Sequence, residues 1–346
     1  MLHVGLDLSR TRLDVCALME GGEPAAITAV SPDADGLKGL ARQLAGFGEP
    51  VRAAIESMNG ARFIHDQLEL AGWEVLVADA QKAKGLAPLA CKTDRIDAWV
   101  LAELCRRALV PEIWLPTPDV RVERERARWR LHLVRHLTAL KNQVHATLMA
   151  FGHPCPVSDL FGVQGRQLLA RLELPEPWHT HVRAACSLID TLNDQIDACV
   201  ADLRRLGADH PYVPILQTAP GVGWVLAYTI AAEIGTIDRF PSPKKLVGYT
   251  GLSPRVDQSG NRDHRGPLSK HGPRYLRWAL IEATTHAAGH PVFAARHQRT
   301  KTRLGRHRGP KIARIDTARR LTEAIWHMLI RNQPFAPAGP MMALAS

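Results

Sequence analysis

Apolar residues in the first 105 positions follow two different periods. Short aliphatic runs bounded by turn residues predict strands at residues 3–8, 12–19, 26–31, 51–56 and 73–79. Apolar residues spaced three or four positions apart predict helices near residues 34–46, 60–71 and 93–107. Three successive strands therefore precede the first helix, and strand–helix units follow, which predicts an α/β domain.

This order of elements is typical of the ribonuclease-H-like (RuvC-like) arrangement, in which the first and fourth strands are neighbours. Asp7 lies in the first strand, and Glu56 ends the fourth. Asp94 and Asp97 open the third helix, where positions i and i+3 share one side of the turn. We therefore expect all four carboxylates at one end of the sheet.

A carboxylate in so apolar a strand is costly to bury unless a cation accompanies it. Four acids at one place predict a site for hard divalent cations such as Mg²⁺, which take oxygen ligands. The alternative is that Asp94 and Asp97 are ordinary solvated acids, favoured at a helix start by the helix dipole.

Beyond Pro111, Pro116 and Pro118 the pattern is mainly helical. Two long amphipathic helices are predicted, near 120–151 and 178–206, and read as a helical hairpin or coiled-coil arm. The expected organisation is an α/β domain (1–110), the arm (111–208), a mostly helical domain (209–334) and a flexible tail (335–346).

Charge is distributed unevenly along the 346 residues. The net charge is −5 over residues 1–105, +3 over 106–206 and +12 over 207–346, and the chain total is +10. An acidic catalytic module joined to a basic one is what a metal-dependent enzyme acting on nucleic acid would need. We see no signal peptide or membrane span, and the six scattered cysteines fit free thiols, so we expect a cytoplasmic protein.

Basic residues are concentrated between Arg255 and Arg314, a stretch that contains 14 Lys/Arg and only three Asp/Glu. Ser259 and Ser269 lie in this stretch, and Ser253 lies just before it; a lone serine before glycine is ordinarily a turn residue. The predicted nucleic-acid contacts are Arg255, Arg262, Arg265, Lys270, Arg274, Arg277, Arg296, Arg299, Lys301 and Arg303.

The four acids and two further segments together resemble one known family. Asp7, Glu56 and the segment Lys92–Ala98 look like the Asp-Glu-Asp-Asp domain of insertion-sequence transposases related to the Piv DNA invertase. The stretch Leu246–Arg255, then Ser259-Gly260, then Leu268–Arg277, resembles the second domain of that family. The similarity covers almost the whole chain and includes the helical arm.

The resemblance implies a DNA recombinase with two cooperating sites. It implies Mg²⁺ bound by Asp7, Glu56, Asp94 and Asp97, and it implies Ser259 as the nucleophile that forms a phosphoserine link to DNA. It also implies sites that combine across the subunits of a dimer or tetramer, donor and target DNA as partners, and a structured bridge RNA as the guide.

Two other functions remain open from the sequence. The first is a RuvC-like junction endonuclease that uses metal-bound water and needs no serine. The second is a non-catalytic nucleic-acid-binding protein on an inactive ribonuclease-H fold, against which the intact set of four acids argues.

Overall fold

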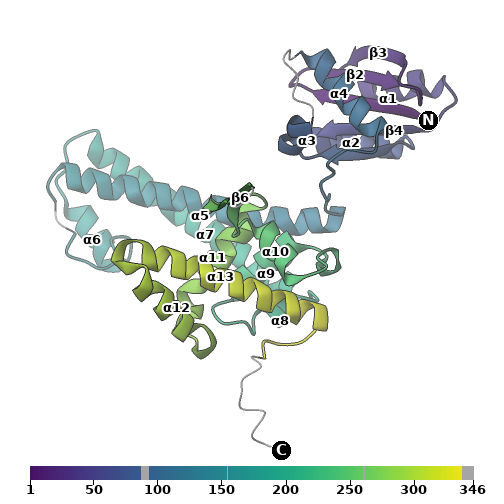
Figure 1. The fold of residues 1–346 in the computed structure, drawn as a ribbon. Helices are drawn as coiled ribbons and strands as arrows, with labels where there is room; N and C mark the ends of the chain where they lie inside the picture. The colour runs from purple at the N-terminus through teal and green to yellow at the C-terminus, as the bar shows by residue number, and fades with distance from the viewer. Residues whose placement is uncertain (87–92, 154, 260–261, 337–346) are drawn as a thin grey trace, which may run out of the picture. The chain divides into compact units, whose positions relative to one another are not determined.

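The computed structural model describes residues 1–86, 93–153, 155–259 and 262–336. Contacts divide the chain into two compact units, residues 1–115 and 116–346 (Figure 1). The further division of the second unit into an arm, a serine-bearing domain and a tail stays a prediction.

A five-stranded sheet is the centre of the first unit. Its strands are β1 (Leu2–Leu8), β2 (Leu13–Leu18), β3 (Pro24–Val30), β4 (Val51–Glu56) and β5 (Glu74–Ala78). Their order is β3-β2-β1-β4-β5, with β2 antiparallel to β1 and β3, and with β4 parallel to β1 and β5. The predicted pairing of the first and fourth strands is confirmed, and the mixed sheet is consistent with a ribonuclease-H-like domain.

Helices pack on both faces of this sheet, as the alternation of strand residues requires. They are α1 (Ala34–Ala45), α2 (Ala61–Leu70), α3 (Ala80–Leu86) and α4 (Asp94–Arg106). Even-numbered β1 residues such as Val4 and Leu6 share a core with α1 and α2. The other face holds small residues, among them Ala54, that pack against α4.

Glycine at position 5 allows α4 to lie directly on β1. A Cβ at Gly5 would stand 1.8 Å from the carbonyl oxygen of Ala98 and 2.4 Å from the amide nitrogen of Ala102. Any larger residue would therefore push the helix away. Gly5 thus sets how closely the N-terminal turn of α4 approaches the strand that carries Asp7.

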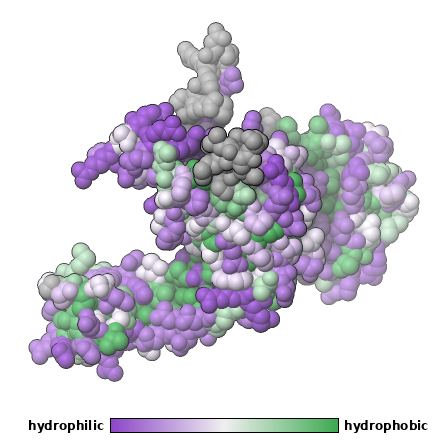
Figure 2. Space-filling model, turned by 90° about the horizontal axis from the view of Figure 1, so that it is seen from below, coloured by the Kyte–Doolittle hydropathy of each residue, from purple (hydrophilic) through white to green (hydrophobic). Residues whose placement is uncertain are grey.

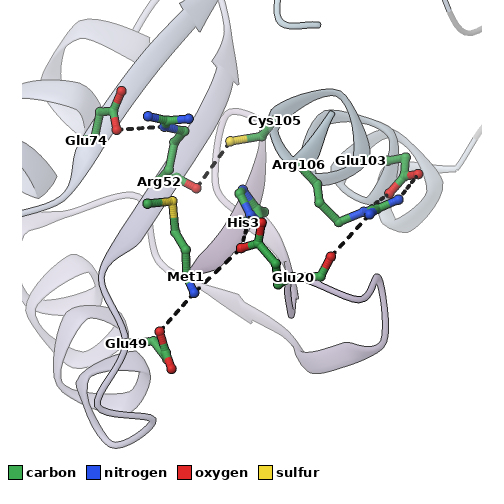
Figure 3. Close-up of polar contacts among 9 residues, drawn as sticks. All are labelled: Met1, His3, Glu20, Glu49, Arg52, Glu74, Glu103, Cys105 and Arg106. Atoms are coloured by element: carbon green, nitrogen blue, oxygen red, sulfur yellow. Dashed lines mark hydrogen bonds and ion pairs between the residues drawn. The ribbon is translucent and has the colours of Figure 1, made fainter. Parts of the chain in front are cut away.

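Polar contacts fix the other end of α4 (Figure 3). The Cys105 thiol donates to the carbonyl oxygen of Arg52 at 3.3 Å. Arg106 donates to the carbonyl oxygen of Glu20 at 3.2 Å and to the Glu103 carboxylate at 2.8 Å. Because this end contacts the starts of the parallel strands, α4 runs antiparallel to β1, and its first turn lies toward Asp7.

Two long helices dominate the first part of the second unit. They are α5 (Pro118–Ala150) and α7 (Trp178–Ala208), with the shorter α6 (Val163–Arg171) between them. Both long helices were predicted within two residues at each end, and they pack side by side (Figure 1). A cluster that includes Val144, Leu169 and Val182 joins the three helices. Supercoiling of the pair stays a prediction.

A helical core with one added hairpin completes the second unit. Its helices are α8 (Val213–Leu216), α9 (Trp224–Ile234), a 3₁₀ turn η1 (Ile237–Arg239), α10 (Pro243–Thr250), α11 (Arg274–Ala287), α12 (Pro291–Arg303) and α13 (Gly305–Arg331). An antiparallel hairpin, β6 (Pro254–Ser259) and β7 (Arg262–Leu268), interrupts them and was not predicted.

The surface of the chain is mixed in character. In the face drawn in Figure 2, hydrophilic residues prevail and hydrophobic residues form smaller groups between them. Among the described helices, none combines the length and the apolar character that crossing a membrane demands.

Candidate functional site

Two carboxylates lie on the face of the sheet that α4 covers. Asp7 alternates with the inward-facing Leu6 on β1 and therefore shares the side of Gly5. Glu56 has the parity of Ala54 on β4, which also packs on that side. The β1–β4 register ends at Leu6 opposite Ile55, so Asp7 and Glu56 follow on adjacent strands.

The first turn of α4 brings two more carboxylates to this place. Thr93 caps the helix by accepting a hydrogen bond from the amide of Ile96 at 3.4 Å. Asp94 and Asp97 then occupy the first turn, where the helix dipole favours negative charge. Asp94 is exposed and Asp97 is partly buried.

The pKa of Asp7 shows that these acids interact. The pKa of Asp7 is raised from 3.8 to about 6, first by burial and then by the charges of Asp97, Asp94 and Glu56, in that order. All three partners predicted for Asp7 thus lie close enough to perturb it. The structure places these acids near enough for their charges to act on Asp7, and their role as one metal site stays a prediction.

Asp14 is a fifth carboxylate that the sequence analysis missed. It lies directly opposite Asp7 in the β1–β2 register, is 3% exposed, and also raises the pKa of Asp7. Arg12 neutralises it through hydrogen bonds of 2.7 to 3.1 Å to both carboxylate oxygens. A single acid in the otherwise apolar run Leu13–Leu18 was the available signal.

The acids fit a hard cation chemically, since every donor is a carboxylate oxygen and the neighbouring acids add to the effect of burial in raising the pKa of Asp7. Within the described residues, however, no three Asp, Glu, His or Cys side chains are close enough together to hold a metal ion. Lys92, the first residue of the segment Lys92–Ala98, lies outside the described residues. Mg²⁺ binding therefore stays a proposal.

Ser259 is the last residue of β6 and pairs with Arg262, the first residue of β7. The residues between them, and the side chains of Ser259, Arg262 and Arg265, lie outside what the structure describes. Ser253 and Ser269 lie at the opposite end of the hairpin, where the Ser269 amide donates to the Ser253 carbonyl oxygen at 2.8 Å. The three candidate serines are thereby separated along one hairpin.

Two glycines in the stretches Leu246–Arg255 and Leu268–Arg277 anchor this hairpin to the helical core. Gly251 and Gly272 have φ of +70° and +90°, and a Cβ at either would collide with backbone: the His271 carbonyl at 2.3 Å and the Tyr249 carbonyl at 1.9 Å. Arg277 reinforces the junction by donating to the Thr250 carbonyl oxygen at 3.0 Å. These glycines let the end of α10 and the start of α11 touch.

The predicted nucleic-acid contacts fall into different environments. Arg299, Lys301 and Arg303 are exposed along α12, and Arg255 and Lys270 are exposed beside the hairpin. Arg296 instead donates to Asp316 at 2.6 and 3.2 Å, and Arg277 is partly buried in the hairpin junction. The exposed cations are the better candidates for phosphate contacts, because no carboxylate among the described residues forms an ion pair with them.

Comparison with known proteins finds transposase family models that match the N-terminal and the C-terminal parts of the chain. A model of the IS110 Asp-Glu-Asp-Asp transposase domain matches residues 4–152, and a model described as the transposase IS116/IS110/IS902 family matches residues 213–298. The transposase for insertion sequence element IS1328 of Yersinia enterocolitica is 28% identical over 245 residues, 67% of this chain and 70% of that protein. The transposase for IS1111A of Coxiella burnetii is 26% identical over 255 residues, 70% of this chain and 68% of that protein.

Coverage differs among the relatives. The alignment with y4qE of Sinorhizobium fredii is 28% identical over 191 residues and spans 55% of this chain, but 47% of the length of that protein.

Proposed function

Because the chain belongs to the IS110/IS116/IS902 family of transposases, we propose that it cleaves and exchanges DNA strands at the ends of an insertion sequence. The observation that carries the proposal is the raised pKa of Asp7, which three further acids on neighbouring elements perturb. Acids so arranged are typical of sites that polarise phosphates with divalent cations.

Asp7, Glu56, Asp94 and Asp97 would hold the cation, which we take to be Mg²⁺. When bound, the cation supplies Lewis-acid stabilisation of charge on a phosphate. The carboxylates themselves fix its place on the sheet, with Asp14 kept apart by its pairing to Arg12.

We assign the nucleophile to Ser259 by the family resemblance. Its Oγ would attack the phosphorus of a DNA phosphodiester, forming the Oγ–P bond as the bond to one deoxyribose oxygen breaks. The proton leaves the serine hydroxyl, and the departing sugar oxygen ends as a hydroxyl. Since one phosphate ester replaces another, a second sugar hydroxyl can later reverse the step and rejoin strands without ATP.

Partners follow from this chemistry. Donor and target DNA would contact the exposed cations of the second unit, and we infer a homo-oligomer, a dimer or tetramer, as the active form. By the same resemblance we propose that a structured RNA, read through base pairing, supplies the target sequence, so that the protein itself does not carry that information.

Covalent trapping on DNA tests the nucleophile. The unmutated protein with labelled element ends should give an adduct that survives a denaturing gel, and Ser259→Ala should bind DNA but give none. Ser253→Ala and Ser269→Ala are matched controls, because both lie at the far end of the same hairpin and contribute only backbone atoms to the 2.8 Å bond between them. Both controls should retain the adduct.

The same experiment separates the alternatives. An adduct that persists in Ser259→Ala would move the nucleophile elsewhere. Cleavage with free ends and no adduct from the unmutated protein would favour the junction endonuclease. Binding without any cleavage in Mg²⁺ would favour the non-catalytic protein.

A further inference from the structure

A series of aromatic rings lies on the exposed side of α5 in the second unit. Trp129, His132 and His136 follow one another at spacings of three and four residues. The Trp129 and His132 rings stack with centroids 5.5 Å apart and planes 20° apart, and the His132 and His136 rings meet edge-on at 4.5 Å. Trp129 is nevertheless 50% exposed.

Arginines from the same stretch of α5 and from α11 surround a tyrosine. Arg128 and Arg135 of α5 and Arg274 of α11 place their guanidinium carbons 5.0, 5.4 and 4.8 Å from the centre of the Tyr275 ring. Arg274 also donates to the Tyr275 hydroxyl at 2.9 Å. Although burial opposes it, this bond and the charges of Arg274 and Arg135 lower the pKa of Tyr275.

The charges of these arginines are not equally available. Arg128 is tied to the fully buried Glu233 by hydrogen bonds of 2.7 and 2.9 Å, so it anchors the cluster to α9. Arg135 and Arg274 are exposed, and neither forms an ion pair with a carboxylate among the described residues. From residue 126 to its end, α5 contains five Lys/Arg and no Asp or Glu.

We propose that this surface (Trp129, His132, His136, Arg135, Arg274 and Tyr275) binds an unpaired DNA strand. Exposed flat rings stack on bases only where the bases are free of a duplex, and the adjacent guanidinium groups suit the phosphates of the same strand. The contacts between the rings hold them in fixed orientations, which lowers the entropy lost on binding. The inference rests on the proposed function, because strand exchange is the step that exposes unpaired DNA.

Equilibrium binding without divalent cations tests the surface independently of the chemistry. The full chain is titrated into a fluorescein-labelled oligodeoxythymidine, and anisotropy is recorded over a range of salt concentrations. Trp129→Ala should weaken binding by about 10-fold, the loss expected for one stacked base. Trp129→Phe keeps a ring and should bind within about 2-fold of the unmutated protein.

Two further variants separate stacking from charge. Arg135→Gln combined with Arg274→Gln should lower the slope of log K against log salt by about 1.4, since each single-strand phosphate contact contributes roughly 0.7. Trp178→Ala removes a tryptophan of similar exposure, 43%, from α7 in the same unit and should leave affinity unchanged. Equal circular-dichroism melting curves check that each variant is folded.

The outcomes are distinct. Unchanged affinity in Trp129→Ala, or equal losses in Trp129→Ala and Trp178→Ala, would overturn the assignment of the surface. Tighter binding of an oligouridine than of the DNA strand, lost in the same variants, would overturn DNA as the occupant. A failed Ser259 adduct assay alongside the expected binding losses would reject the proposed chemistry and leave this surface in place.

Discussion

Replacing Asp7 with Asn should stabilise the first unit when no divalent cation is present. The substitution keeps the shape of the side chain and removes a charge that Asp97, Asp94, Glu56 and Asp14 all repel. Without a cation, repulsion between the carboxylates destabilises the folded protein, and the Asn side chain does not take part in this repulsion. The gain in melting temperature of Asp7→Asn therefore measures how strongly the other carboxylates repel the charge of Asp7.

The magnitude follows from the pKa. A rise from 3.8 to about 6 means that the folded protein holds this proton more tightly than the unfolded chain. Stability is therefore highest below the ordinary pKa and is lost as the pH rises toward 6. At roughly 1.4 kcal/mol per pKa unit the loss has an upper limit of about 3 kcal/mol. Because Asp7 is partly exposed, solvent screening reduces this to about 1–2 kcal/mol.

Calorimetric melting in a chelator, at pH 4 and at pH 7.5, checks this expectation. At pH 7.5 Asp7→Asn should melt a few degrees higher than the unmutated protein, and at pH 4 the difference should nearly vanish. Adding Mg²⁺ should raise the melting temperature of the unmutated protein more than that of the variant. Asp35→Asn, which removes an exposed acid from the first turn of α1, is the control and should destabilise slightly.

Two results would refute the reasoning. The first is a variant no more stable than the unmutated protein at pH 7.5. The second is a stability difference of equal size at both pH values, since a charge effect must disappear once the carboxyl group is protonated.

Three further changes probe other parts of the chain. Gly5→Ala should destabilise the first unit by about 1–3 kcal/mol in urea unfolding and abolish DNA cleavage, because α4 must move away from β1. Gly39→Ala is the control: it has open space around it in α1 and should stabilise the unit by up to about 1 kcal/mol. Neutralising the three exposed α12 cations named above should lower the duplex-DNA salt slope by up to about 2.7, whereas Arg296→Gln should change it little because Asp316 already pairs with that charge. Glu233→Gln should cost about 3 kcal/mol, measured by urea unfolding, since it removes the carboxylate that pairs with the buried Arg124 and the partly exposed Arg128.

The five strands and three of the four helices of the first unit were predictable because their packing imposes clear periods, whereas the short α3 was not predicted. Strands β1, β2, β4 and β5 each contribute buried residues to one continuous core, and the partly buried residues of β3 pack against it, so the aliphatic pattern reflects this burial. The hairpin of β6 and β7 shows no aliphatic pattern of this kind, since the sequence of β6, Pro-Arg-Val-Asp-Gln-Ser, offers almost no apolar face to bury. Its pairing depends on backbone hydrogen bonds and on the junction at Gly251 and Gly272, which no local period reveals.

The convergence of the four acids could be predicted for a similar reason. Strand parity and helical spacing decide which side a residue faces, and both can be read from positions alone. How closely those sides approach cannot be read in that way. Gly5 determines the distance between α4 and β1, and a glycine in a strand is equally compatible with a bulge or a turn. Asp14 joins the site only through the antiparallel register that places it opposite Asp7. The identity of the acids is thus a property of the sequence, whereas the strength of their mutual repulsion, and with it the affinity for a cation, depends on contacts between elements that are distant along the chain.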